Sequence, residues 1–293
     1  MGIVLGPNRY GKSEVRLVHV ERSTPRHTIT DLTVSTALWG DFAAAHLVGD
    51  NGHVLTTDAQ KNTIYAFARN GIGEIEEFGL RLARHFVGSY DWIRGARVAI
   101  TRHGWDRIEV DGQGHDHAFS RAGDESRTTV VTVEDAATHL VSGLTDLVVL
   151  KSTGSEFHGF PRDAFTTLPE TPDRILATAV TARWLYVTDG TTPIDYAKTF
   201  AGIRATLLET FASLPSRALQ QTLYAIGHAV LTAFTDVAEI RLSMPNRHHF
   251  TVDLEPFGLD NPNVVFYAAD RPYGLIEGTV TRDDAPDAGA AWD

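Results

Sequence analysis

An amide and an imidazole stand two residues apart near the end of the chain, and they form its most informative chemical pair. Asn246 and His248 lead into an alternating apolar run over residues 250–254. Alternation at period two predicts a half-buried strand, in which Asn246 and His248 face one side and His249 faces the other. Such a pair can hold a small polar molecule and handle a proton.

Two other segments carry residue types that can act on a proton or an anion. Lys12 directly precedes an expected strand, where a lysine is most often solvated. Burial would instead lower its pKa and make it a base. Thr57 or Asp58 is expected to cap a helix that begins near Ala59. The free N–H groups of that helix start can also hold an anionic ligand, and a partnered Thr57 hydroxyl can relay a proton.

Arg174 and Phe157 are candidates for ligand contacts in the middle of the chain. Arg174 precedes the apolar pair Ile175 and Leu176, which predicts a partly buried guanidinium with a bidentate partner. A structural carboxylate is the commoner partner, and a ligand is the alternative. Phe157 fits either a core position or a stacking platform, and its spacing does not decide between them.

One short pattern resembles a metal site. His115 and His117 would face one way on a strand and could hold iron, copper or zinc. The flanking residues 111–114 indicate a hairpin turn, where polar residues gather anyway, so we predict no metal site. The sequence also has no phosphate-binding glycine loop, dinucleotide fingerprint or serine-hydrolase elbow.

Composition narrows the function classes. The 293 residues include 26 basic and 37 acidic residues, a net charge of −11, which disfavours nucleic acid as a partner. An anionic small ligand would need a local arginine or lysine. The chain has no cysteine, which excludes disulfides, thiolate zinc sites, iron–sulfur clusters and cysteine nucleophiles.

No targeting or membrane segment is recognisable. The longest apolar runs fall short of the roughly 18 residues of a membrane helix. The N-terminal region becomes charged too early for a signal peptide, and the C-terminus lacks a peroxisomal address. We therefore expect a cytoplasmic protein with no membrane partner, and a bacterial origin would fit.

Periodicity predicts an α+β fold with two similar halves. In the first half we expect strands at 14–20, 28–38, 98–101, 105–110 and 128–133, and a helix at 74–86. In the second half we expect strands at 144–151, 183–187, 239–244, 248–254 and 274–281, and a helix over 196–234 broken near 214–216. The first two strands should form a hairpin that turns at 23–26. Each half then has antiparallel strands with helices on one face, and the boundary falls near residues 135–140.

Taken together and in order, the short motifs resemble urate oxidase (uricase) along essentially the whole chain. The matching stretches are Tyr10-Gly11-Lys12, Thr57-Asp58 with Lys61-Asn62-Thr63, residues 151–157, Asp173-Arg174-Ile175-Leu176, residues 219–224, Pro245-Asn246-Arg247-His248 and Gly274-Leu275-Ile276. Each stretch is short, but seven in register are specific.

The resemblance implies an architecture that patterning alone only permits. It implies two tandem tunnelling-fold (T-fold) modules, residues 1–136 and 137–293. Two chains would close a β-barrel, and two barrels would stack into a homotetramer with a central tunnel. The active site would lie between subunits, so an isolated monomer should be inactive.

The resemblance also implies roles for individual residues. Lys12, Thr57 and His248 would form a catalytic proton relay. Urate would be held by Thr57, Asp58, Phe157, Arg174, Leu219, Gln220 and Asn246. Asn246, with Thr57, would also hold O2 and later the attacking water. The product would be 5-hydroxyisourate with release of hydrogen peroxide, and no metal or flavin would be needed because urate is itself the reductant.

The sequence departs from the family at a few positions, and other functions stay open. His158 and His249 receive no catalytic role, and Leu219 stands where some relatives have valine, which alters packing rather than chemistry. One alternative is another T-fold enzyme of purines or pterins, such as a cyclohydrolase or aldolase relative. A second is a catalytically silent purine-binding or barrel-forming protein, which would not need Lys12 or His248.

Overall fold

The computed structural model describes residues 2–135, 137–188, 193–269 and 271–292. Its contacts divide the chain into two compact units. The first comprises the chain up to Gly143, Leu185–Ala197 and the segment from Pro286, and the second comprises Leu144–Trp184 and Lys198–Ala285. Division into tandem modules at 136/137 stays a prediction, and residue 136 itself lies outside the described residues.

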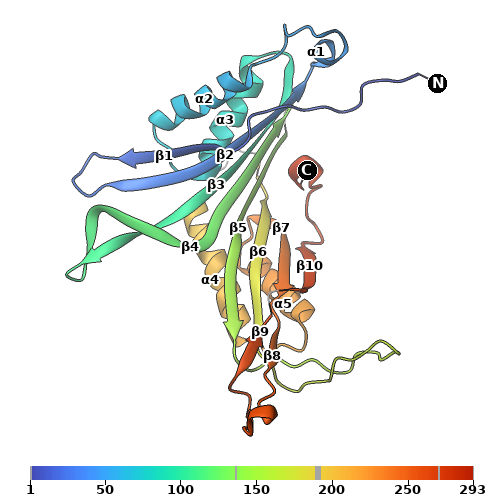
Figure 1. Ribbon diagram of the computed structural model, residues 1–293. Helices are drawn as coiled ribbons and strands as arrows, with labels where there is room; N and C mark the ends of the chain where they lie inside the picture. The colour runs from blue at the N-terminus through green and yellow to red at the C-terminus, as the bar shows by residue number, and fades with distance from the viewer. Residues whose placement is uncertain (1, 136, 189–192, 270, 293) are drawn as a thin grey trace. The chain divides into compact units, whose positions relative to one another are not determined.

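The first unit is built on antiparallel strands that neighbour one another in chain order. These strands are β1 (Val15–Glu21), β2 (Thr28–Gly40), β3 (Ile93–Val110) and β4 (Gln113–Glu134). Its helices are α1 (Ala43–Val48), α2 (Thr57–Arg69) and α3 (Ile75–Ser89). Figure 1 shows α2 and α3 over the same face of these strands. The predicted β1–β2 hairpin is confirmed, since Val15 pairs with Val34 and Glu21 with Thr28.

The helical spacing predicted for residues 74–86 forms the core of this unit. Ile75, Phe78, Leu82 and Phe86 are all fully buried on α3. They follow one another at intervals of three or four residues, so they make one apolar stripe. Burying each such side chain contributes about 1.5–3 kcal/mol relative to exposure. The stripe therefore fixes which face of the sheet the helices cover.

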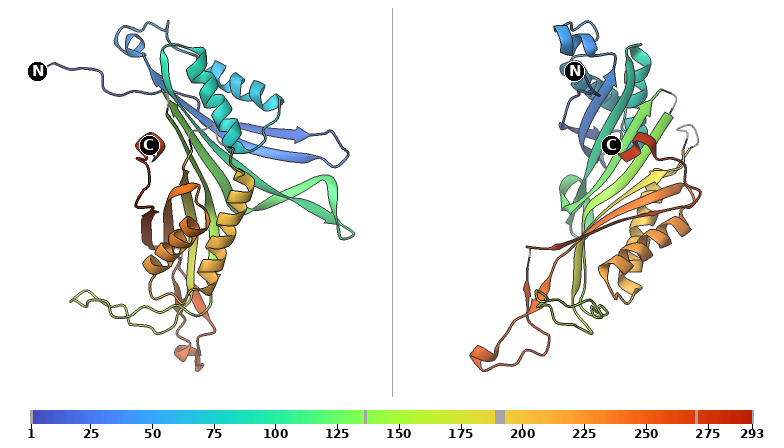
Figure 2. Two further views of the ribbon diagram at one scale, coloured as in Figure 1. Left: turned by 180° about the vertical axis from the view of Figure 1, so that it is seen from behind. Right: turned by 90° about the vertical axis from the view of Figure 1, so that its right-hand side faces the viewer.

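The second unit repeats the arrangement of strands and helices. Its strands are β5 (Ala137–Lys151), β6 (Leu176–Tyr186), β7 (Val237–Asn246) and β10 (Gly274–Thr281), in that order across the sheet. Its helices are α4 (Tyr196–Ser213) and α5 (Leu219–Ala233), which confirms the predicted break near 214–216. Both views in Figure 2 show these helices on one face of the strands. The predicted α+β class is confirmed.

Glycines let α5 lie close to β10. A Cβ added at Gly227 would stand 2.4 Å from the Val280 side chain, and one at Gly278 would stand 2.8 Å from that of Leu223. Both separations are shorter than van der Waals contact. The close approach matters for the site because α5 begins at Leu219 and β10 begins beside Asn246.

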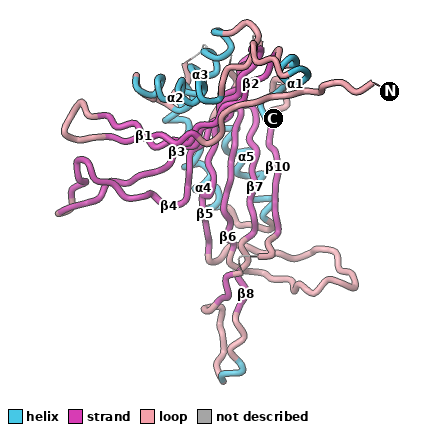
Figure 3. The backbone as a smooth tube through the Cα atoms, turned by 45° about the horizontal axis from the view of Figure 1, so that its top comes forward, coloured by secondary structure: helices cyan, strands magenta, loops and turns pink. Residues whose placement is uncertain are grey.

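The strand predicted for residues 248–254 is largely wrong. β7 ends at Asn246, and β8 (His249–Thr251) is a separate strand of three residues that pairs with β9 (Phe266–Ala268). Figure 3 shows β8 as a short strand between loops. The paired part of the strand stops there because the pairing of β7 with β10 ends at Asn246 and Gly274. His248 therefore lies in a linker and shares no strand face with Asn246.

Other boundaries also differ from expectation. The runs predicted at 98–101 and 105–110 are one strand, β3, and β4 begins early enough to include His115 and His117. Helix α1 and the 3-10 turns Glu255–Phe257 and Gly289–Trp292 were not predicted. Within the described part of the chain, none of the helices has the length and apolarity needed to span a bilayer.

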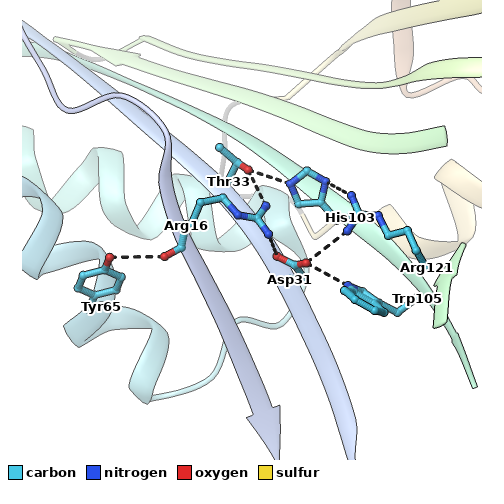
Figure 4. Close-up of polar contacts among 7 residues, drawn as sticks. All are labelled: Arg16, Asp31, Thr33, Tyr65, His103, Trp105 and Arg121. Carbon is cyan, nitrogen blue, oxygen red and sulfur yellow. Dashed lines mark hydrogen bonds and ion pairs between the residues drawn. The ribbon is translucent and has the colours of Figure 1, made fainter. Parts of the chain in front are cut away.

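A buried carboxylate joins the strands of the first unit (Figure 4). Asp31 on β2 is 2% exposed. Its Oδ1 accepts from Arg16 at 2.5 Å, and its Oδ2 accepts from the Trp105 indole at 3.0 Å. Arg121 lies 3.4 Å from the same Oδ2 and donates to His103. β1, β2, β3 and β4 each contribute a residue, so the cluster fixes their register.

A second buried carboxylate attaches α3 to the sheet. Glu76 is fully buried, and its side chain accepts from Arg127 of β4 at 2.8 Å and from the Ser142 hydroxyl at 2.5 Å. Arg127 also pairs with Glu74 at 2.8 Å. Removing one partner of such a pair leaves an uncompensated charge in the core.

We expect Arg127→Met to lower the free energy of unfolding by about 3–5 kcal/mol, because Glu76 would stay buried without its cation. Urea denaturation measures the change. Arg26→Met is the matched control, since Arg26 pairs with Asp116 where both side chains are 54% exposed, and it should cost less than about 1 kcal/mol. Equal losses in the two variants would contradict a special role for the buried pair.

Candidate active site

The start of α2 presents free backbone donors. Thr56 is the N-cap, and its side chain accepts from the Ala59 N–H at 3.1 Å. The prediction that Asp58 or Thr57 caps the helix is therefore wrong, because the cap lies one residue before Thr57 and two before Asp58. Thr57 and Asp58 are instead the first two helical residues, whose N–H groups have no acceptor within the helix. This arrangement suits an anionic or carbonyl-rich ligand.

The Asp58 carboxylate is engaged on the helix surface. It accepts from Lys61 at 2.5 Å and from Asn62 at 2.9 Å. The Lys61 hydrogen bond is the main cause that holds the pKa of Asp58 below its usual range, and the nearby charge of Lys12 adds to it. Asp58 can therefore contribute its N–H to a ligand, while its carboxylate holds cations beside it.

Lys12 reaches this helix start because its segment lies against β2. The Thr36 N–H donates to the Lys12 carbonyl at 2.8 Å, and Tyr10 exchanges two backbone hydrogen bonds with Leu38. The Tyr10 hydroxyl donates to the Leu55 carbonyl at 3.0 Å, just before α2. Lys12, Thr57 and Asp58 therefore gather in the first unit as one group of candidate residues.

A second group gathers in the second unit, where Asp173 orders a loop. Its carboxylate accepts from the Thr153 hydroxyl at 2.6 Å and from the N–H of Gly154 at 2.9 Å. The Thr153 hydrogen bond is the main cause that lowers the pKa of Asp173. The Arg174 N–H donates to the Ser155 carbonyl at 2.7 Å. The segments around residues 153–157 and 171–174 are thus fixed side by side.

The same loop is tied to the start of α5. The Ser216 N–H donates to the Gly154 carbonyl, and the Glu156 N–H donates to the Ser216 carbonyl at 2.8 Å. The Ser216 hydroxyl, itself buried, contacts the Thr222 hydroxyl at 2.8 Å. These bonds bring the first residues of α5 toward the loop.

Leu219 and Gln220 are those first residues of α5. Leu219 is 2% exposed, so its side chain belongs to the core and only its backbone can meet a ligand. The Gln220 side chain is exposed. The N–H groups of both residues lie in the first helical turn, where they have no acceptor within the helix.

Arg174 is half-buried, and its guanidinium has no carboxylate partner among the described residues. It lies over the Phe157 ring, with its central carbon 4.8 Å from the ring centroid. Its Nε is buried without a hydrogen-bond partner in the described structure. Burial lowers the pKa of Arg174. The expected structural carboxylate is therefore absent there, and the other alternative, a ligand, is favoured.

Main-chain bonds place His248 close to this arginine. The Arg247 N–H donates to the Ala177 carbonyl at 2.9 Å, three residues beyond Arg174. The His248 ring stacks on Phe250 with centroids 5.6 Å apart. Burial, and then the positive charge of Arg174, lower the pKa of His248. The lowered pKa favours the neutral imidazole, the form that can accept a proton.

The sequence named the candidate side chains, and the structure adds residues that hold their segments in place. Asp173, Thr56 and Ser216 had no predicted role, although Asp173 stands in a motif that was singled out.

His115 and His117 contact each other edge to face on β4, with centroids 4.5 Å apart. Across the described ranges, no cluster of three or more His, Asp or Glu side chains is suited to a metal.

We expect the pKa of His248, followed by NMR of ring-labelled histidine, to lie below about 6.5. Arg174→Gln should raise that pKa, because it removes a nearby positive charge, but only in part, because burial remains. An unchanged His248 titration in Arg174→Gln would show that the two side chains are not close neighbours.

Comparison with known proteins places the chain among relatives of one kind. The uricase family model matches residues 8–132 and 140–277. A uricase of Arthrobacter globiformis is 56% identical over 281 residues, which cover 96% of this chain and 91% of the relative. A uricase of Dictyostelium discoideum is 37% identical, with 94% of this chain and 96% of the relative covered.

Solved structures agree with the sequences. The crystal structure of the uricase from Arthrobacter globiformis superimposes with a TM-score of 0.95 at 54% identity, covering all of this chain and 99% of that one. A uricase from Bacillus fastidious gives a TM-score of 0.82 at 25% identity, with 96% of each chain covered. These similarities confirm the fold class implied by the resemblance. The chain belongs to the uricase family.

Proposed function

We propose that the two groups of residues described above are the two halves of the site at which this chain oxidises urate. The first half is Lys12, Thr57 and Asp58. The second half is Phe157, Arg174, Leu219, Gln220, Asn246 and His248. The observation that carries the proposal is the Arg174 guanidinium, half-buried over Phe157 with no carboxylate partner in the described structure. A planar anion would give this guanidinium a negatively charged hydrogen-bond acceptor.

Binding follows from the residue types. Urate is a flat monoanion at neutral pH, and Arg174 can meet it with two parallel N–H donors. Gln220 complements an opposite polar edge with its amide, and Phe157 offers a ring for stacking. The N–H groups of Thr57 and Asp58 hold further oxygen or nitrogen atoms. These local donors offset the net charge of −11.

Chemistry starts with removal of a proton. Lys12, Thr57 and His248 form a hydrogen-bonded relay that takes a proton from bound urate, with the neutral His248 as an acceptor. The resulting dianion gives electrons to O2 more readily than the monoanion. Two electrons pass from the substrate to O2, and two protons, one from the relay and one from solvent, complete hydrogen peroxide. Water adds to the oxidised ring and gives 5-hydroxyisourate, so atoms and electrons balance.

Asn246 holds the second reactant. It ends β7 beside Gly274, with its amide half-buried. With Thr57 it holds O2, and later the attacking water, next to the ring. The substrate itself is the reductant, so the proposed reaction uses urate, O2 and water with neither a metal nor a flavin.

The two half-sites are proposed to come from different subunits of a homotetramer. Two chains close a barrel from their T-fold modules, residues 1–136 and 137–293, and two barrels stack around a central tunnel. The family resemblance supports this assembly. Neither nucleic acid nor a membrane is a proposed partner, and the cytoplasmic location expected from the sequence stays a prediction.

Mixed tetramers test the shared site. Lys12→Met tetramers and His248→Asn tetramers should each lose urate-dependent O2 consumption. Tetramers assembled from both variants together should regain about a quarter of wild-type activity, because one site in four receives both intact halves. The assay follows loss of urate absorbance and release of peroxide in the presence of a chelator.

Two outcomes would contradict the proposal. Mixed tetramers that stay inactive, while equal mixtures with wild-type chains are active, would place both halves within one subunit. Wild-type protein that binds urate but consumes no O2 under chelation would favour a silent purine-binding protein or a cofactor-dependent enzyme instead.

A further inference from the structure

Two buried polar side chains connect the Lys12 segment with the start of α2. Thr36 of β2 is 5% exposed, and Gln60 of α2 is fully buried. Gln60 lies on the same helix face as Ile64 and Ala68, which are also buried. An apolar residue would satisfy packing at this position. A buried amide there is costly unless every polar atom is paired.

The pairing runs from Lys12 to the residue before the cap of α2. The Lys12 N–H donates to the Thr36 hydroxyl oxygen at 3.2 Å. The Thr36 hydroxyl donates its single proton to Gln60 Oε1 at 2.7 Å. Gln60 Nε2 donates to the Leu55 carbonyl at 3.3 Å. A carbonyl only accepts, so the amide has one orientation, with its oxygen toward Thr36.

The backbone approach at this point is unusually close. A Cβ at Gly11 would stand 1.7 Å from the Thr36 carbonyl oxygen and 2.8 Å from Ala37 Cα. The Thr36 N–H also donates to the Lys12 carbonyl. The segment before Lys12 therefore lies directly against the backbone of Thr36 and Ala37 on β2. Any shift of Thr36 would move Lys12 with it.

We infer that Thr36 and Gln60 are positioning residues that set the separation between Lys12 and Thr57. The inference rests on the proposed roles of Lys12 and Thr57 in the relay. Neither Thr36 nor Gln60 needs to touch urate, because each acts through backbone atoms of the segments that carry the relay. Proton transfer depends steeply on heavy-atom separation, whereas urate binding rests mainly on Arg174 and Gln220.

Thr36→Val tests the inference because it removes the hydroxyl and keeps the shape. The turnover number kcat should fall about tenfold or more, since small misplacements of reacting groups cost up to about 100-fold, while KM for urate changes little. Thr36→Ser restores the hydroxyl and should restore kcat. Thr129→Val is the matched control, because Thr129 is 1% exposed and its hydroxyl donates to the Val141 carbonyl away from both segments.

Gln60→Glu is a second variant with a different chemical basis. It keeps the size of the side chain and an acceptor for Thr36, but it faces the Leu55 carbonyl with a carboxylate oxygen in place of a donor. The start of α2 should then shift, and kcat should again fall more than urate affinity. This variant keeps the inference testable if Thr36→Val does not fold.

The outcomes separate this inference from the site proposal. Unchanged kcat in Lys12→Met would refute the proposed relay itself. A loss in Lys12→Met with wild-type kcat in both Thr36→Val and Gln60→Glu would overturn the positioning role alone. Equal losses in Thr36→Val and Thr129→Val, or a rise in KM at unchanged kcat, would also overturn it, because either result is what a general packing defect gives.

Discussion

The candidate site depends on an arginine, Arg174, that is half-buried with no carboxylate partner among the described residues. A desolvated cation is unfavourable unless something compensates it, and the Phe157 ring 4.8 Å away supplies only part of that compensation. The loop that bears both side chains must therefore be fixed by other bonds. Asp173 does this through Thr153 and Gly154, and Ser216 ties the loop to α5. In the proposed site, Arg174 thus carries a charge that meets no carboxylate in the described structure.

In the first unit, the groups left without a partner within their helix are backbone N–H donors and not a charged side chain. Thr56 caps α2 and satisfies one N–H, which leaves those of Thr57 and Asp58 for a ligand. Thr36 and Gln60 fix the neighbouring Lys12 segment. In each unit, hydrogen-bonded polar groups thus hold the segments that carry the candidate site residues.

Local pattern was enough to predict the longer helices and to select the candidate site residues. The stripe on α3 and the break between α4 and α5 follow from periodicity and from Pro215. Asn246 and His248 were wrongly placed on one strand, because alternation continues past the point where β10 stops pairing with β7. A sequence pattern does not reveal where a partner strand ends.

Thr36 and Gln60 were harder to find, because a sequence pattern does not show which distant residues pair with each other. Thr36 reads as an ordinary strand threonine and Gln60 as an ordinary helix residue, and only pairing across 24 residues of sequence gives them a shared role. For Arg174, the apolar flank correctly indicated partial burial, but only the folded loop shows that its guanidinium has no carboxylate partner among the described residues. The family resemblance pointed to Arg174 as a candidate for urate binding, and its contacts give a physical reason for that proposal.

The central claim is that Arg174 is kept for the substrate rather than for stability. Anaerobic equilibrium binding of urate to Arg174→Gln, together with its thermal unfolding midpoint, tests this most directly. The account predicts binding weaker by about 10- to 100-fold, the loss of one charge-assisted hydrogen-bond set, with a midpoint that is unchanged or higher. Unchanged urate affinity, or a large fall in the midpoint, would contradict it.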